Sequence, residues 1–125
     1  MSGDRTSKLI AIIDDDEAMQ DSLRDLMEAA GLVAQCFGSA EEFLESDLHT
    51  RAACLIVDIR MPKMSGLQLQ ARLKEEECNI PIIFITAHGD VDVIAHVMAD
   101  GAVDCLLKPF SEDSLLKAIT RALSC

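Results

Sequence analysis

Residues 54–87 read CLIVDIRMPKMSGLQLQARLKEEECNIPIIFITA, and this stretch decides the fold. It begins and ends with continuous apolar runs rich in β-branched residues, Cys54–Ile59 and Ile80–Ala87. Between them, Leu69 and Leu73 stand four residues apart, which is the spacing of one face of a helix. Continuous apolar runs predict strands that are buried on both faces. A strand, a helix and a second such strand in succession predict parallel pairing.

The same alternation of strand and helix occurs five times along the chain. Gly31 is well placed to end the first helix, Ser39 and Glu42 form a capping box at the head of the second, and Ser111 can cap the last. The pattern predicts an α/β fold of flavodoxin type: a doubly wound, five-stranded parallel sheet in the order 2-1-3-4-5, with five helices. A barrel of eight such units would need a longer chain. The predicted strands are residues 9–13, 32–37, 54–59, 80–87 and 102–107. In the fourth helix one apolar stripe consists of Val91, Ile94, Ala95 and Met98.

Composition limits the class of protein. The 125 residues suit one compact domain, and we expect a single domain over residues 1–125 with a flexible N-terminus at residues 1–7. Half of the residues are hydrophobic and 26% are charged, which is typical of a globular chain. We find no signal peptide and no apolar run long enough to span a membrane, so we expect a cytoplasmic protein without membrane contact. The net charge of −11 argues against direct binding of nucleic acid.

The five cysteines show no C-x-x-C pattern and no Cys/His spacing. An odd, unpatterned number predicts thiols in a reducing compartment rather than disulfides or a zinc site. Cys54 and Cys105 lie inside apolar runs, which predicts that they are small buried side chains.

Distinctive polar residues stand where four of the five predicted strands end. Asp14 and Asp15 follow the first strand, Asp58 lies near the end of the third, Thr86 ends the fourth, and Lys108 follows the fifth. In an open parallel sheet, ligands bind beyond the carboxyl ends of the strands, where the strand order reverses. The first and third strands are neighbours there, so the three acids should meet. Three carboxylates in one crevice are costly unless a cation shares it, and oxygen ligands favour Mg²⁺.

In that setting Asp58 would be a carboxylate nucleophile able to accept a phosphoryl group. A metal ion, the Lys108 ammonium and the Thr86 hydroxyl would neutralise the charge that develops on the phosphoryl oxygens. An aspartate inside a predicted buried strand needs such partners. Pro62 and Gly66, in the loop after Asp58, suit a turn whether or not the site is functional, so they do not discriminate between the two interpretations.

Four motifs together, IIDDDE, DIRMPKMSG, FITAHGD and GAVDCLLKPF, resemble the receiver domain of two-component response regulators. The resemblance covers nearly the whole chain. It implies that Asp58 is the phosphoacceptor and that Mg²⁺ is bound directly by Asp15, by Asp58 and by the backbone carbonyl of Arg60, and through water by Asp14. The two remaining acids of the first motif, Asp16 and Glu17, are expected at the start of the first helix.

The resemblance also implies roles for the later motifs. Thr86, Ala87 and Lys108 would bind the phosphoryl group and relay the switch, with a cis bond from Lys108 to Pro109. Arg60 and His88 would tune the lifetime of the phosphoryl group. Receivers of this kind usually carry an aromatic residue at the position of Cys105, so the switch is atypical here. The three histidines, His49, His88 and His96, lack metal or nucleophile partners in the sequence and are expected at the surface.

The implied partners are a sensor histidine kinase and, on phosphorylation, a second copy of the chain through the face Asp90–Leu107. DIRMPKMSG and TAHGDV are most similar to FixJ-like receivers that carry a LuxR-type helix-turn-helix output domain. No output domain follows in this chain, so DNA would be contacted only through an attached domain. We favour an N-terminal receiver of a transcription regulator over a stand-alone receiver, and we do not expect a dedicated enzyme.

Two alternatives remain open. A haloacid-dehalogenase-like phosphatase also uses an aspartyl nucleophile, in a D-x-D motif that Asp14 and Asp16 could mimic, but the chain is short and has no cap region for a substrate. A pseudo-receiver would bind partners without ever accepting phosphate. Substitution of Asp58 distinguishes a receiver from the phosphatase, and labelling with a small phosphodonor distinguishes a receiver from a pseudo-receiver.

Overall fold

A computed structural model describes residues 8–124 of the chain, so the predicted flexible N-terminus at residues 1–7 lies outside the described residues. Five parallel strands form one sheet in the order β2-β1-β3-β4-β5, which confirms the predicted topology. The strands are β1 (Leu9–Ile13), β2 (Val33–Phe37), β3 (Cys54–Asp58), β4 (Ile82–Thr86) and β5 (Asp104–Leu107). The helices are α1 (Glu17–Ala29), α2 (Ala40–Glu45), α3 (Gly66–Glu75), α4 (Val91–Ala99) and α5 (Glu112–Leu123), with a 3₁₀ turn, η2 (Asp47–Thr50), after α2. None of the helices within residues 8–124 is long and apolar enough to cross a membrane.

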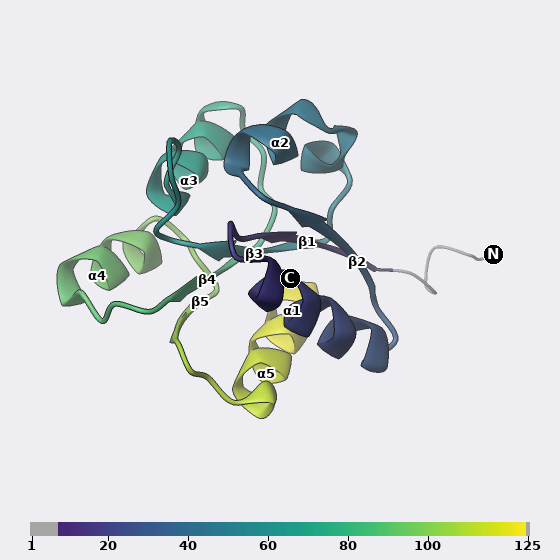
Figure 1. Ribbon diagram of the computed structural model, residues 1–125. Helices are drawn as coiled ribbons and strands as arrows, with labels where there is room; N and C mark the ends of the chain where they lie inside the picture. Colours follow the sequence, from purple (N-terminus) through teal and green to yellow (C-terminus); the bar gives the residue numbers. More distant parts are fainter. Residues whose placement is uncertain (1–7, 125) are drawn as a thin grey trace.

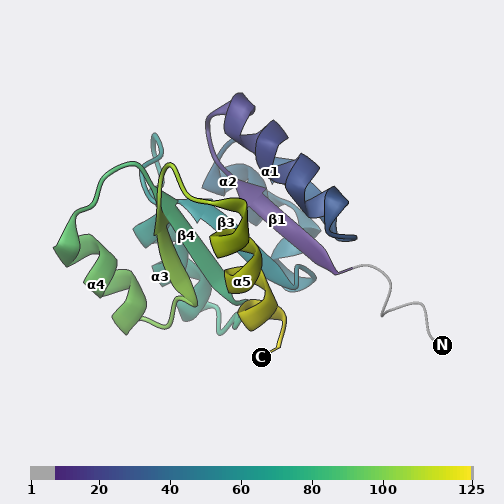
Figure 2. The same cartoon turned by 90° about the horizontal axis from the view of Figure 1, so that it is seen from below.

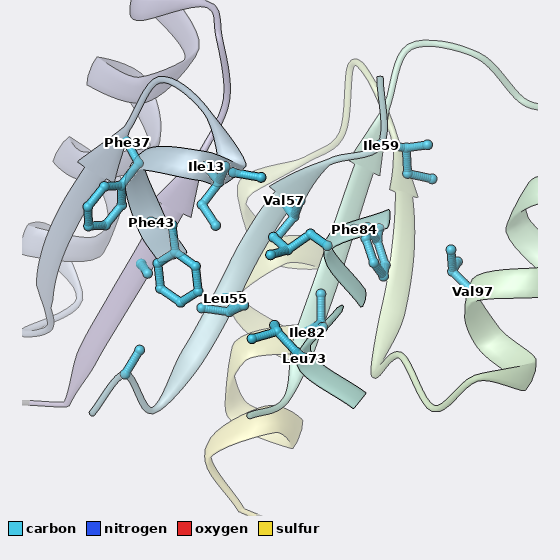
Figure 3. Close-up of a cluster of buried hydrophobic side chains, with 14 residues drawn as sticks. Ile13, Phe37, Phe43, Leu55, Val57, Ile59, Leu73, Ile82, Phe84 and Val97 are labelled. Carbon is cyan, nitrogen blue, oxygen red and sulfur yellow. The ribbon is translucent and has the colours of Figure 1, made fainter. Parts of the chain in front are cut away.

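Helices cover the sheet on both faces (Figures 1 and 2). On one face α2, α3 and α4 pack on side chains such as Leu55, Val57 and Phe84 (Figure 3). On the other face α1 and α5 pack on Ile10, Ile56 and their neighbours. Strands β3 and β4 are buried along their whole length and β1 along nearly all of it, whereas the edge strands β2 and β5 are partly exposed. The continuous apolar runs in the sequence therefore correspond to the central strands.

The helix caps were predicted in part. Ser111 caps α5 by accepting a hydrogen bond from the Ser114 amide at 3.0 Å, as expected. Ser39 caps α2, but the predicted capping box with Glu42 is wrong in its second half, because the Glu42 carboxylate accepts from the Gly38 amide. A complete capping box occurs instead at the head of α3, between Ser65 and Gln68. This box fixes the start of the helix that follows the loop after Asp58.

Helix α4 does not bury the stripe that the sequence singled out. Val91 is 76% exposed and Met98 is 40% exposed, and the buried residue is Val97, with Val93 beside it. The helix lies at the β5 edge of the sheet, so only one flank of it is covered (Figure 1). A short helix with two apolar stripes is ambiguous in the sequence, because either one could face the core.

Candidate functional site

Three acids converge at the carboxyl edge of the sheet. Asp14 follows β1 and Asp58 ends β3, and the two strands are neighbours with Ile13 paired to Val57. One carboxylate oxygen from each of Asp14, Asp15 and Asp58 lies within 4.8 Å of the others, and we call these three residues the acidic cluster. Asp14 is fully buried, Asp58 is 7% exposed, and Asp15 is exposed. The prediction that the acids meet is confirmed.

The run of four acids divides into two local structures. Asp14 turns its carboxylate inward, and its Oδ1 accepts a hydrogen bond from the Asp16 amide at 2.9 Å. Asp16 is the N-cap of α1 and accepts from the Ala18 amide, and Glu17 lies in the first turn, where the helix dipole favours an acid. The predicted placement of Asp16 and Glu17 is therefore confirmed. Only the first two acids of the run remain available to the cluster.

Lys108 supplies the positive charge opposite the acidic cluster. Its Nζ lies 3.0 Å from Asp58 Oδ2 and 3.4 Å from Asp14 Oδ2, and its peptide bond to Pro109 is cis, as predicted. Burial alone would lower the pKa of Lys108, but hydrogen bonding to Asp58 and the field of both carboxylates raise it overall. Burial raises the pKa of the Asp14 carboxyl above its usual range, although the Asp16 amide and Lys108 oppose this shift. The ammonium therefore stays charged between two acids that share it.

The loop after β3 is held by its own backbone. Asp58 Oδ1 accepts from the Arg60 amide at 3.0 Å, and the Gly66 amide donates to the Ile59 carbonyl at 2.8 Å. A Cβ atom at Gly66 would lie 2.9 Å from the Ile59 Cα and 3.0 Å from the Asp58 carbonyl oxygen. Close packing against the strand end is thus a further reason for glycine at position 66, one that the sequence did not reveal.

Thr86 is held by the loop that follows it. Its Oγ1 accepts from the His88 amide at 3.1 Å and donates to the His88 carbonyl at 3.2 Å. Thr86 is 2% exposed, whereas the following residues Ala87 and His88 are exposed. The Lys108 amide donates to the Thr86 carbonyl at 2.8 Å, so the ends of β4 and β5 are joined beside the acids. The Thr86 side chain thus has a local partner in this structure.

A cleft of about 500 Å³ opens between the loop after β3 and the loop before α4. It contains three of the predicted site residues, Arg60, Thr86 and His88. Its apolar wall was not predicted, because it joins part of the DIRMPKMSG loop to one residue of α3 and one of α4, segments that are separate in the sequence. That wall consists of Ile59, Met61, Pro62, Leu67 and Val93.

Cys105 lies on β5 and packs against the cluster that contains Phe84 and Val97. It is half-buried rather than fully buried, so the sequence expectation was correct for Cys54, which is inaccessible, and only partly correct for Cys105. Burial, followed by the charge of Asp104, raises the pKa of the Cys105 thiol. The small side chain leaves no large group between β5 and α4 at this position.

The donors of the acidic cluster suit a hard divalent cation. Every candidate ligand is a carboxylate oxygen, and a fully buried carboxylate next to a second one needs more positive charge than one shared ammonium provides. Oxygen ligands are the ones that Mg²⁺ prefers in proteins. The acidic cluster is therefore typical of magnesium binding.

Residues 10–120 match the model of the response regulator receiver domain family. The chain therefore belongs to this family, and the acidic cluster is the phosphorylation pocket of a receiver domain rather than the active site of a dedicated enzyme. Membership implies a cognate histidine kinase.

Two regulators and one crystal structure are similar to this chain over most of its length. Response regulator protein TodT of Pseudomonas putida is 48% identical over 120 residues, which are 96% of this chain and 52% of TodT. Transcriptional regulatory protein FixJ of Bradyrhizobium diazoefficiens is 40% identical over 114 residues, which are 91% of this chain and 56% of FixJ. The crystal structure of FixJ-N superimposes with a TM-score of 0.85 at 39% identity and covers 93% of each chain. The chain thus spans about half the length of the curated relatives it matches.

Proposed function

We propose that this receiver takes a phosphoryl group from the phosphohistidine of a sensor histidine kinase onto Asp58. The observation that carries the proposal is the setting of Asp58, a nearly buried carboxylate with Lys108 Nζ at 3.0 Å and two further acids within reach. In the transfer the phosphorus–nitrogen bond of the donor breaks and a phosphorus–oxygen bond to Asp58 forms. The imidazole of the kinase is the leaving group.

Asp15, Asp58 and the Arg60 carbonyl would hold Mg²⁺ directly, and Asp14 would do so through water. The bound ion supplies charge neutralisation at the phosphoryl oxygens. Lys108 contributes a second positive charge from the protein itself, and its Nζ would exchange a carboxylate for a phosphoryl oxygen. Water must reach the acyl phosphate to hydrolyse it. The exposed neighbours Arg60 and His88 would tune that access and hence the lifetime.

The proposed switch begins at Thr86. Its hydroxyl now bonds the His88 backbone at 3.1 and 3.2 Å, so it must give up those bonds to bind a phosphoryl oxygen. Phosphorylation adds about −1.5 to −2 charges and three acceptor oxygens, which favours that exchange. The loop through Ala87 and His88 would follow Thr86 and shift α4. With Cys105 in place of an aromatic residue, the signal would travel mainly through this loop.

The proposed readout is the face Asp90–Leu107, through which two phosphorylated copies would pair. Val91, Met98 and Leu107 expose 76%, 40% and 48% of their surface there, and apolar groups of this size favour burial against a partner. We further propose that the chain serves as the receiver of a transcription regulator with a LuxR-type output domain. The regulators TodT and FixJ, of which it matches about half, support this assignment.

Labelling with acetyl phosphate tests the phosphoacceptor. Wild-type protein with Mg²⁺ should gain one phosphoryl mass in intact-mass spectrometry, and Asp58→Asn should gain none. Asp16→Asn is the matched control, because it removes an acid of the same run that caps α1 outside the cluster. Labelling that persists in Asp58→Asn and disappears in Asp14→Asn would instead favour the phosphatase alternative. Wild-type protein that takes no phosphoryl group from acetyl phosphate or from a kinase would be a pseudo-receiver.

A further inference from the structure

Gln20 lies in the first turn of α1, and its side chain turns back to the strand ends. Its Nε2 lies 2.6 Å from the carbonyl oxygen of Asp14 and 3.5 Å from that of Phe37. Both carbonyls stand at the carboxyl edge of the sheet, one just after β1 and one at the end of β2. Gln20 matches no sequence motif and falls between the apolar positions of α1, so the sequence predicts no role for it.

The carbonyl of Asp14 belongs to the peptide group that joins Asp14 to Asp15. The amide on the other side of Asp14 is already fixed, since it donates to the Phe37 carbonyl at 3.1 Å. The Asp14 carboxylate is fixed by the Asp16 amide and by Lys108. The exposed Asp15 side chain has no hydrogen bond of its own among the described residues, so its direction depends on the peptide plane that precedes it.

We propose that Gln20 is a positioning residue: by donating to the Asp14 carbonyl it fixes the Asp14–Asp15 peptide plane and thereby aims the Asp15 carboxylate at the cation site. This inference rests on the proposed function and adds to it a residue that touches neither metal nor phosphoryl group. A neutral amide suits the task, because it donates to a carbonyl without adding charge beside three acids. A carboxylate at this position would face two acceptors and have nothing to donate.

Gln20 is also well anchored for this task. Its own amide donates to the Asp16 carbonyl at 3.0 Å, in the first turn of α1, and its carbonyl accepts a weak bond from the Cys36 thiol at 3.7 Å. The side chain therefore ties the N-terminal end of α1 to β1 and β2 at one point. A displacement there would reach Asp15 within a single peptide unit.

Three proteins test the proposal: wild type, Gln20→Met and Gln20→Glu. Methionine keeps the length of the side chain and the helix propensity and removes only the donor. Gln35→Met is the matched control, because Gln35 is exposed on β2 and its side chain makes no hydrogen bond among residues 8–124. Mg²⁺ affinity is measured by titration calorimetry on unphosphorylated protein. Acetyl phosphate labelling is followed at low and at saturating Mg²⁺, and thermal unfolding is followed by circular dichroism in EDTA, since the chain has no Trp or Tyr.

Gln20→Met should bind Mg²⁺ about three- to tenfold more weakly, which corresponds to one hydrogen bond. Its labelling should be slow at low Mg²⁺ and should recover at saturation, while its unfolding temperature in EDTA stays near that of Gln35→Met. Gln20→Glu should also bind Mg²⁺ more weakly than wild type. If only the electrostatic field mattered, Glu would tighten Mg²⁺ binding and Met would leave it unchanged, and that result overturns the proposal.

The two proposals fail in different ways. If wild-type protein is not labelled at Asp58, the phosphoacceptor assignment fails, while the calorimetric comparison still tests Gln20. If wild type is labelled and Gln20→Met matches it in Mg²⁺ affinity and labelling rate, only the role of Gln20 is refuted. An equal loss at low and saturating Mg²⁺ would make Gln20 a general stability residue, which also contradicts positioning.

Discussion

At the β1–β3 end of the sheet the polar atoms around the acids have fixed partners, whereas at the β5 end helix α4 exposes apolar side chains to solvent. Asp14 is held through its amide, its carbonyl and its carboxylate, by three different parts of the chain. Helix α4 is held through one buried flank around Val97, and its opposite face carries Val91 and Met98. The protein is thus held firmly where its acids converge, and it is loosely covered at α4, on the proposed readout face.

Two glycines allow the comparison to be tested with the same substitution. Gly66→Ala should lower the free energy of unfolding by about 1–3 kcal/mol, because the new Cβ meets the Ile59 Cα at 2.9 Å and backbone cannot yield cheaply. Gly89→Ala is the control near α4, where the nearest atom is the tip of Leu107 at 3.4 Å, on a side chain that is 48% exposed. Urea unfolding measures both variants. If both variants lose the same free energy of unfolding, the region around Gly66 is no more tightly packed than the region around Gly89.

Removing a charge from the acidic cluster should stabilise the protein. Asp14→Asn in EDTA should raise the unfolding temperature by a few degrees, because the raised pKa of Asp14 shows that folding disfavours its ionised form. The folded state holds the proton more tightly than the unfolded chain does, so the penalty is present above the raised pKa and disappears as the pH falls through it. The difference between variant and wild type should therefore shrink toward acid pH.

The same variant should lose Mg²⁺ affinity, which is measured by calorimetry. Asp16→Asn provides the control, since that residue caps α1 and lies outside the acidic cluster. A variant that is less stable than wild type at neutral pH would show that the contact with Lys108 outweighs the cost of burying the acid.

One buried side chain links α4 to α3. Gln70 of α3 is 5% exposed, its Nε2 donates to the Val97 carbonyl at 3.1 Å, and its Oε1 has no hydrogen-bond partner within residues 8–124. Gln70→Leu loses the bond but also removes the unsatisfied oxygen, and Val97 keeps the Ala102 amide as a donor at 3.0 Å. The global stability should change by less than about 1 kcal/mol. Hydrogen exchange in α4 should nevertheless become faster, and unchanged exchange would show that Gln70 does not hold the helix.

The sequence predicted the β1–β3 end of the sheet better than it predicted the packing of α4. The central strands were predictable because they are buried on both faces and read as continuous apolar runs. The acids were predictable as a site because charged residues at the end of a buried strand are costly unless they have partners. The role of Gln20 was missed because it depends on the backbone of β1 and β2, which no pattern within α1 records. The close packing of Gly66 was missed because it depends on the three-dimensional path of the loop after β3. The covered flank of α4 was not predictable because its partner, β5, is a half-exposed edge strand.

The smallest effect on stability is expected at the exposed face of α4. Val91→Ser should change the free energy of unfolding by less than about 0.5 kcal/mol, because the side chain is already 76% exposed. It should nevertheless weaken dimerisation of the phosphorylated protein, as measured by sedimentation with and without acetyl phosphate. Val33→Ser is the matched control, since Val33 is 46% exposed on β2, at the opposite edge of the sheet. If both variants dimerise like wild type, the apolar face of α4 is not the readout surface, and the loose end of the sheet must serve another partner.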